Sequence, residues 1–271
     1  MDNFLLSCIF KLKNTIMRIY VCVKQVPDTA ASIQIIEGNR IDERMTFIIN
    51  PYDEHCLTEA AKIRDAQPGS EVVAVSLGNE SVQESLRSAL AMGADRSIHI
   101  QSDARHDSLE TARILKAAIE QDGKPDLILT GREAIDSGGM QTMFRLGALL
   151  QLPVLSNVVH IEIQDGKALV STEAEQGSRL QYAVDLPCVL GAGKGLNTPR
   201  YPTFPDIMKA RKKEIRTIDR QELAVEAPGS SMDLLELTAV VEDRTPRPIQ
   251  GDPDTAVDEL IRILEQEARI I

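Results

Sequence analysis

The chain has 271 residues, of which 41 are acidic and 30 basic, so its formal net charge is −11. A surface with this charge repels phosphate backbones, which argues against general nucleic-acid binding, although a local basic cluster could still dock a partner. Hydrophobic residues make up 43% of the chain, as in a globular protein, and aromatic residues only 3%. The core is therefore expected to be aliphatic.

The cysteines and histidines form no pattern that is typical of a metal site. The four cysteines lie at 8, 22, 56 and 188, without a CxxC spacing, and so few in a long chain do not indicate a disulfide framework. The four histidines, at 55, 99, 106 and 160, form no HxxxH pair. We expect no metal ligands. Because no run reaches 18 apolar residues, we also expect no insertion into a membrane.

The first 16 residues differ from those that follow. They contain a short apolar run followed by Lys11 and Lys13, whereas a secretory signal places its charge before the apolar run. A mitochondrial presequence would be rich in Arg, and none occurs before Arg18. We expect residues 1–16 to be a dispensable extension or a misassigned start, with Met17 beginning the domain.

From Arg18 onward, short apolar runs alternate with amphipathic segments. The first strand is predicted at 18–24, and a hairpin follows with arms at 32–36 and 40–49 around a turn at 37–39. Asn50 can cap the first helix and Pro51 suits its first turn. Further strands are predicted at 71–77, 97–100 and 126–130, and further helices at 81–92, 108–119 and 141–150. This alternation predicts a parallel sheet with helices on both faces.

The pattern changes after Pro153. Alternating runs at 154–163 and 167–172, and a third at 180–190 that Pro187 interrupts, predict antiparallel or mixed β structure added to the parallel core. A Gly/Pro-rich loop is expected at 191–205, a basic helix start or arm at 208–215, linkers at 224–231 and 244–253, and an amphipathic helix at 256–268. The fold class is therefore α/β, a Rossmann-like parallel sheet with added antiparallel strands, a protruding loop and a C-terminal arm and helix.

Four loops are candidates for a ligand site. Ligands of open parallel sheets bind beyond the carboxyl ends of the strands, where we place residues 24–28, 50–53, 77–80 and 131–142. In the last loop, Gly138 and Gly139 allow close approach to the backbone, and the next helix offers free N–H groups, which suits a phosphate. The same pattern equally fits a Gly-rich connection without a ligand. Lys24 and Asp53 could meet there, as a structural ion pair or in catalysis.

No known catalytic motif is present. The sequence lacks GxGxxG after the first strand, a P-loop and a GxSxG elbow, and we assign no catalytic residue. His55 is expected to pack on a helix rather than to act as a base.

Five segments, in order, resemble the β subunit of electron transfer flavoproteins. They are VKQVPD at 23–28, NPYDE at 50–54, ALAMGADR at 89–96, GREAID at 131–136 with Gln141, and LNTPRYP at 196–202 leading into IMKA at 207–210. The resemblance implies a heterodimer whose α subunit carries the redox FAD, while residues 17–223 hold a buried AMP and residues 224–271 contact the α subunit. It implies a cytoplasmic bacterial electron carrier rather than a stand-alone enzyme. Such a carrier takes electrons from acyl-CoA dehydrogenase-type flavoenzymes of fatty acid β-oxidation and passes them to a membrane quinone oxidoreductase.

The resemblance also implies which residues bind the nucleotide and the partner. Nucleotide contacts would be Cys22, Asn50, Pro51, Tyr52, Asp53, Leu77, Gly131, Arg132, Glu133, Ala134, Ile135, Asp136, Ser137, Gly138, Gly139, Met140, Gln141 and Thr142. In the recognition loop at 192–201, partner contacts would be Leu196, Asn197, Pro199, Arg200 and Tyr201, with Leu196 as an exposed apolar anchor. The basic residues Lys209, Arg211, Lys212 and Lys213 could steer an acidic partner.

Two alternatives stay open at this level. Gln141 and Thr142 match the AMP-binding pattern. Gln25, Pro27 and the pair Tyr52-Asp53 look more like the electron-bifurcating branch, in which a second FAD replaces AMP. Ser137, Gly138 and Gly139 also depart from the family's usual acidic or Asp-Thr residues. The other alternative is a nucleotide-binding module without redox function, similar to universal stress proteins.

Overall fold

The computed structural model describes residues 16–225, 232, 234–240 and 246–270. Residues 1–15 of the expected extension, 226–231 of the first expected linker and 244–245 of the second lie outside this set. The chain divides into two compact units, one of Met1–Gln34 and Asp42–Leu234, the other of Ile35–Ile41 and Leu235–Ile271. Each unit is described by itself.

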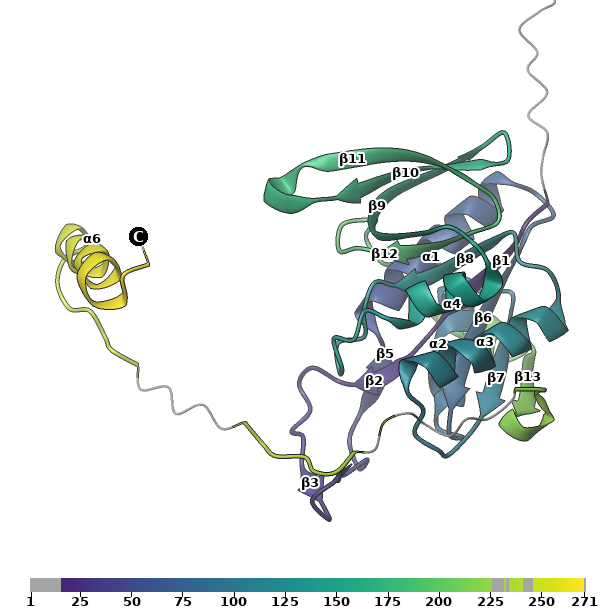
Figure 1. Cartoon of the computed structure of the whole chain (residues 1–271), viewed down its shortest axis with the longest axis horizontal. Coiled ribbons are helices and arrows are strands. Elements are labelled where there is room, and N and C mark those ends of the chain that lie inside the picture. Colours follow the sequence, from purple (N-terminus) through teal and green to yellow (C-terminus); the bar gives the residue numbers. More distant parts are fainter. Residues whose placement is uncertain (1–15, 226–231, 233, 241–245, 271) are drawn as a thin grey trace, which may run out of the picture. The chain divides into compact units, whose positions relative to one another are not determined.

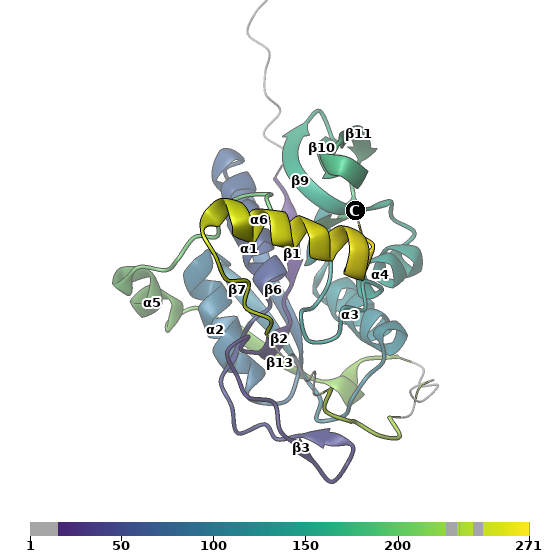
Figure 2. The same ribbon diagram turned by 90° about the vertical axis from the view of Figure 1, so that its left-hand side faces the viewer.

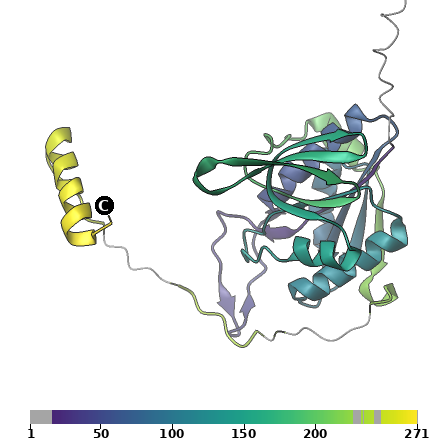
Figure 3. The same ribbon diagram turned by 45° about the horizontal axis from the view of Figure 1, so that its top comes forward.

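The first unit is built on a nine-stranded sheet with the order β11-β10-β9-β12-β8-β1-β6-β7-β13 (Figure 1). Pairing is parallel from β9 across to β13, and antiparallel between β9, β10 and β11, which form a curved continuation of the sheet (Figure 3). The strands are β1 Arg18–Cys22, β6 Glu71–Gly78, β7 Arg96–Gln101, β8 Leu127–Gly131, β9 Val154–Gln164, β10 Lys167–Glu173, β11 Arg179–Asp185, β12 Cys188–Ala192 and β13 Ile215–Asp219. The predicted α/β class is confirmed.

Helices cover both faces of this sheet (Figure 2). Helices α1, Pro51–Ala66, and α2, Val82–Met92, pack on one face through an aliphatic core that includes Leu57, Ala60 and Leu86. Helices α3, Ser108–Asp122, and α4, Thr142–Leu150, pack on the other face with Ile114 and Leu146. Because both faces are covered, the central strands are apolar throughout rather than alternating.

The structure refines one prediction about the later strands and corrects another. The run at 180–190 is two strands: β11 at the antiparallel edge, and β12, which lies between β9 and β8 and is parallel to both. The basic segment at 208–215 is neither the start of a helix nor a free arm. Its first three residues end a short helix, α5 at Phe204–Ala210, and its last residue begins β13, an edge strand parallel to β7. Two 3₁₀ turns complete this unit, Glu175–Gly177 and Arg220–Glu222.

The predicted hairpin exists but is short. Strands β3, Ile35–Ile36, and β4, Arg40–Ile41, pair around a turn in which Glu37 and Gly38 both have positive φ. Most of the predicted second arm is extended chain, and its end forms β5, Phe47–Ile49, which pairs with β2, Gln25–Pro27, in the first unit.

The second unit contains the β3–β4 hairpin and the C-terminal helix. The predicted helix at 256–268 is confirmed: α6 spans Pro253–Arg262 and continues as a π-helical segment, Ile263–Ala268. Asp252 caps α6 by accepting the N–H of Thr255.

Strand order places a switch point beside β1. The chain runs from β1 to β6 and β7 on one side, then crosses to β8 and β12 on the other side. Loops that leave β1 and β8 therefore diverge at their carboxyl ends, which is where open α/β sheets form ligand sites.

Candidate functional site

Asp53, in the first turn of α1, joins the ends of the two strands at the switch point. Its Oδ2 accepts the backbone N–H of Lys24, beyond β1, at 2.7 Å, and its Oδ1 accepts that of Gly131, at the end of β8, at 2.9 Å. Asn50 Nδ2 donates a third hydrogen bond, to Oδ1, at 3.1 Å. Asp53 thus sets the separation of the two loops. Burial raises the pKa of Asp53 to about 7, against the opposing effect of these donors.

Asn50 fixes the start of the 131–142 loop rather than capping a helix. It occupies the N-cap position of α1, but its side chain makes no capping hydrogen bond, which corrects the sequence-based expectation. Its Nδ2 instead donates to Glu133 O at 2.9 Å, and its Oδ1 accepts the N–H of Ile135 at 3.2 Å. Asn50 and Asp53 therefore act together on the loop that follows β8.

Lys24 and Asp53 do interact, but not through the Lys24 ammonium, as an ion pair would require. Asp53 bonds to the Lys24 backbone, whereas the Lys24 ammonium lies 2.7 Å from both carboxylate oxygens of Asp136, within the loop. This ion pair is partly exposed to solvent. Lys24 was expected in a candidate loop, but neither as a nucleotide contact nor as the partner of Asp136. Because Asp136 lies 112 residues away, no local pattern could have revealed the pair.

The middle of the loop is open to solvent. Residues 135–141 are exposed, and a Cβ built on Gly138 or Gly139 would meet no atom within 4 Å. At the far end, Gln141 Oε1 accepts hydrogen bonds from Ser108 Oγ at 3.1 Å and from Arg145 at 2.7 Å. The loop is thus tied at both ends and accessible between them, as a ligand-binding loop requires.

Arg132 links this loop to neighbouring elements. Its guanidinium lies 5.3 Å from the ring centroid of Tyr52 and donates to Glu133 at 2.7 and 2.9 Å. It also donates to Asn157 Oδ1 on β9 at 2.9 Å, and its backbone N–H donates to Ala192 O. The Arg132 guanidinium therefore holds the loop to neighbouring elements of the fold.

Three further polar or sulfur groups lie near the strand ends. Burial, and then the nearby Asp53 charge, raise the pKa of Cys22 to about 12, so its thiol is protonated at neutral pH. Thr130 Oγ1, one residue before the end of β8, is buried with no hydrogen-bond partner among the described residues. His99 Nε2 lies 3.1 Å from the carbonyl oxygens of Gly78 and Asn79, where β6 ends close to half-buried Leu77. Sequence reasoning missed Thr130 and His99, which carry no motif.

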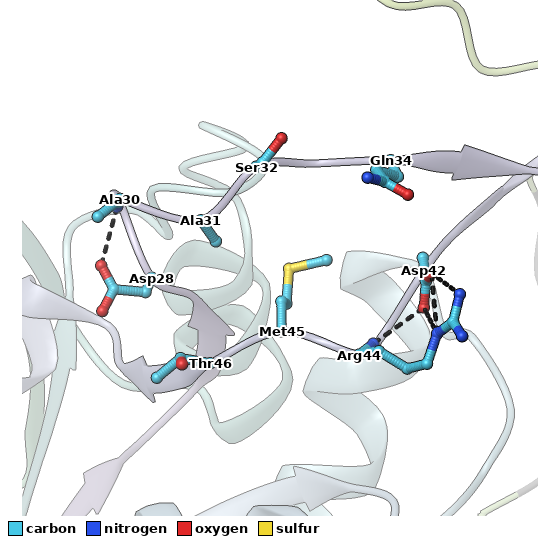
Figure 4. A pocket seen from close by; sticks show the side chains of 9 residues that line it. All are labelled: Asp28, Ala30, Ala31, Ser32, Gln34, Asp42, Arg44, Met45 and Thr46. Carbon is cyan, nitrogen blue, oxygen red and sulfur yellow. Dashed lines mark hydrogen bonds and ion pairs between the residues drawn. The ribbon is translucent and has the colours of Figure 1, made fainter.

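An open hollow of about 610 Å³ has a lining that includes none of the residues described above (Figure 4). It is lined by residues before and after the short hairpin, and only Asp28 belongs to a predicted loop. The cation of its lining, Arg44, is already paired with Asp42 at 2.6 Å. We therefore assign no ligand to this hollow.

The loop at 193–203 is held against helix α1. Asn197 Nδ2 donates to His55 O at 2.9 Å and to Glu59 Oε2 at 3.0 Å, and its Oδ1 lies 3.1 Å from His55 Nδ1. The backbone N–H of Arg200 donates to Thr58 Oγ1. Because Glu59 is buried, the hydrogen bond from Asn197 replaces one that its carboxylate would otherwise accept from water. His55 packs as expected, and its role in holding this loop was not foreseen.

The five expected partner contacts differ in exposure. Leu196 is half-buried and packs against the α1–α2 core, so the expectation of an exposed anchor is corrected. Asn197 faces α1, and Pro199 is partly buried. Arg200 is exposed but paired with Asp206 at 3.2 Å, and Tyr201 is almost fully exposed.

Replacing Asn197 by alanine should loosen this loop without unfolding the chain. The variant loses the side-chain bonds to His55 and Glu59, and we expect a loss of about 1–3 kcal/mol in the free energy of unfolding. Trypsin should cleave after exposed Lys194 or Arg200 several times faster than in the wild type. The control is Thr198→Ala, because the exposed Thr198 side chain makes no hydrogen bond with the described part of the chain. Equal cleavage rates for both variants would contradict the role of Asn197.

The fold and the site together are those of an α/β protein that binds a ligand in loops at the switch point of its parallel sheet. A family model described as "Electron transfer flavoprotein domain" matches residues 39–223. Two relatives are named "Electron transfer flavoprotein subunit beta": that of Syntrophomonas wolfei is 33% identical over 94% of this chain and 98% of its own length. The Bacillus subtilis protein is 32% identical over 94% of this chain and 100% of its own length. The "Caffeyl-CoA reductase-Etf complex subunit CarD" of Acetobacterium woodii is 38% identical over 77% of this chain and 80% of its own length.

The chain belongs to the electron transfer flavoprotein β subunit family, so its general function is electron transfer in a flavoprotein. Among the residues that the structure describes, no helix has the length and apolar character to cross a membrane. The same residues contain no cluster of His, Cys, Asp or Glu that could hold a metal ion.

Proposed function

We propose that this chain is the β subunit of a heterodimer whose α subunit carries FAD, and that it binds AMP at the ends of β1 and β8. The observation that carries the proposal is the position of Asp53, which ties these two strand ends together at the switch point. When bound, the FAD of the α subunit supplies the redox chemistry. The residues of this chain would hold the structural nucleotide and position the partners.

The site has the features that an adenine nucleotide needs. The loop at 131–142 is fixed at both ends and open at Gly138 and Gly139, and Thr130 presents a buried hydroxyl without a partner in the described chain. Residues 50–53 begin a helix, whose N-terminus favours anions. The predicted contacts from Cys22 to Thr142 remain a proposal, and these features support it. A nucleotide that binds only the folded chain would also stabilise it.

We further propose that the C-terminal segment contacts the α subunit. Within the second unit, Val257, Leu260 and Ile261 form an apolar stripe on α6 and are each more than two-fifths exposed. The opposite side of the helix is polar, with ion pairs that join Arg262 to Glu259 and Glu267. A helix of this kind is expected to bury its stripe against another protein surface.

The electron donors would be acyl-CoA dehydrogenase-type flavoenzymes of fatty acid β-oxidation, and the acceptor a membrane quinone oxidoreductase. The loop at 196–201 would contribute to donor recognition. Functional residues of this kind commonly lie on loops that a rigid scaffold positions, here α1. These partners, and a cytoplasmic bacterial location, are part of the proposal.

A second candidate is an electron-bifurcating subunit with FAD in place of AMP. The similarity to a subunit of the caffeyl-CoA reductase–Etf complex favours it. Cofactor content distinguishes the two candidates. We would co-express the chain with its α subunit, denature the purified heterodimer and quantify the released nucleotides by chromatography. One FAD and one AMP per heterodimer support the first candidate, and two FAD support the second. A flavin-free homodimer would contradict both and favour a stress-protein-like nucleotide module.

A further inference from the structure

We propose that Arg145 determines the specificity of the nucleotide site: its guanidinium binds the 5′-phosphate of AMP and so selects a nucleoside monophosphate. The residue lies in the first turn of α4, directly after the loop at 131–142. The contacts that the family resemblance implied end at Thr142 and do not include it. The inference rests on the proposed function, because it concerns the same site, and it names the chemical group that this site recognises.

Arg145 carries the unmatched charge of this part of the site. Arg132 is paired with its neighbour Glu133 at 2.7 Å. Asp136 is paired with Lys24, also at 2.7 Å. Arg145 makes no ion pair with a residue that the structure describes. The loop and the first turn of α4 therefore present a net positive charge, which favours an anionic ligand.

The start of α4 lacks the groups that usually neutralise a helix N-terminus. Its first turn contains no acidic residue, and Gln141 at the N-cap position makes no side-chain capping hydrogen bond. A cation in the first turn opposes the helix dipole, so Arg145 is unfavourable there when no ligand is bound. A phosphate at this point reverses the balance, because it interacts favourably with both the free N–H groups and the guanidinium.

Hydrogen bonds hold the guanidinium toward the start of the helix. Gln141 Oε1 accepts a hydrogen bond from Arg145 Nη2 at 2.7 Å and another from Ser108 Oγ, on the neighbouring helix α3, at 3.1 Å (Figure 1). Side chains on a helix lean toward its N-terminus, and the bond to a residue four positions earlier shows this direction for Arg145. The other N–H groups of the guanidinium make no hydrogen bond with the described residues, so they are available to phosphate oxygens.

Thr130 gives an independent indication of a ligand near the start of α4. Its side chain is buried, with 6% exposed, and Oγ1 has no hydrogen-bond partner among the described residues. Because side chains alternate along a strand, Thr130 lies on the same face of the sheet as Ile128, which belongs to the apolar cluster of α3 and α4. The hydroxyl thus lies at the end of β8 on the side where α4 begins. Buried hydroxyls normally have a partner, and a bound nucleotide would supply one.

The charge of the phosphate accounts for the selectivity. A phosphomonoester carries about −1.5 to −2 at pH 7. Each phosphate within a dinucleotide such as FAD is linked on two sides and carries less charge. A guanidinium fork binds two oxygens of one phosphate, and the bond is stronger for the more highly charged group. Arg145 therefore favours AMP over adenosine and over a dinucleotide.

The test compares three ligands of the heterodimer, which is first freed of nucleotide by gel filtration at high salt. Calorimetric titration gives the Kd for AMP, for adenosine 5′-(methyl phosphate), which is a diester, and for adenosine. The wild type should bind AMP most tightly. Arg145→Met keeps a long side chain that suits a helix, and it should raise the Kd for AMP by about tenfold or more without changing the Kd for adenosine.

The same variant should not destabilise the nucleotide-free heterodimer. Its midpoint of thermal unfolding should be unchanged or higher, because the variant removes a cation from a helix N-terminus. Arg113→Met is the matched control. Arg113 lies on α3, is partly buried like Arg145, and makes no ion pair within the described part of the chain. It lines a separate hollow with Leu149 and Val225, and its variant should bind AMP as the wild type does.

The remaining outcomes would overturn the inference in different ways. Equal Kd values for AMP in Arg145→Met and Arg113→Met would remove the role of Arg145 and leave the proposed function intact. Equal losses of affinity for AMP and adenosine, with a lower unfolding midpoint, would make Arg145 a structural residue. A wild type that binds the methyl ester as tightly as AMP would reject selection of the monoester. A wild-type heterodimer that takes up FAD but no AMP, or that contains no flavin, would instead refute the proposed function and the inference with it.

Discussion

Replacing Asp53 by asparagine should destabilise the chain by about 2–3 kcal/mol and empty the nucleotide site. The carboxylate accepts N–H groups on both oxygens, from Lys24 on Oδ2 and from Gly131 and Asn50 on Oδ1. An asparagine supplies only one acceptor oxygen, so its amide would place N–H against at least one of these buried donors. The free energy of unfolding in urea at pH 8 measures the loss, and nucleotide released on denaturation measures occupancy.

The same variant should change how stability depends on pH. Burial raises the pKa of Asp53 to about 7, whereas an unfolded Asp titrates near its ordinary value of about 4. Between these values the folded chain binds a proton that the unfolded chain lacks. The Asp53 contribution to stability is therefore fully present below about pH 4 and is lost as pH rises through 7. Because asparagine does not titrate, the stability difference between wild type and variant should widen as pH falls from 8 to 5.

A constant or narrowing difference would contradict this prediction. It would mean that the three N–H donors, which favour the ionised form, outweigh the cost of burying the charge. Asp28→Asn provides a control, because the Asp28 side chain accepts only a local hydrogen bond from Ala30 in an exposed turn. We expect Asp28→Asn to leave the free energy of unfolding close to that of the wild type.

Local patterns predicted the parallel core well and its edges poorly. Strands such as β1 and β6 are short, β-branched and buried on both faces, so their sequences differ clearly from the helices between them. Strand β13 escaped prediction because five residues at an edge, three of them polar or charged, follow a basic segment that resembles a helix. Strand β12 was recognised as a strand, but its place between β9 and β8 depends on pairing that no local pattern encodes.

The site divides in the same way. Its position beyond the strand ends followed from the predicted parallel sheet, and the loop at 131–142 does lie at the switch point. The contacts of each side chain there depend on residues that are distant in the sequence. The Asn50 side chain makes no capping hydrogen bond in α1 and instead bonds to Glu133, 83 residues later. The family resemblance implied an exposed Leu196. In the structure Asn197 holds that loop against α1, and Leu196 packs against the core. Tertiary contacts thus override local tendencies most strongly where the functional loops attach.

Gly131→Ala should lower both stability and nucleotide content, whereas Gly139→Ala should lower nucleotide content alone. A Cβ on Gly131 would lie 2.7 Å from Tyr52 Cβ and 3.0 Å from Asn50 Nδ2, and it would overlap Asp53 Oδ1. Since these neighbours hold both strand ends, we expect the variant to lose about 1–3 kcal/mol of stability and most of its nucleotide. Urea unfolding and denaturing extraction measure the two losses.

Gly139 belongs to the same loop but lies in open space, with no atom within 4 Å of an added Cβ and no left-handed φ. Gly139→Ala should therefore change the free energy of unfolding by less than about 0.5 kcal/mol. If the nucleotide approaches the backbone at 138–139, as the Gly pair suggests, this variant alone should lose nucleotide at unchanged stability. A Gly131→Ala variant as stable as the wild type would show that the strand ends tolerate displacement and that Asp53 does not fix their separation.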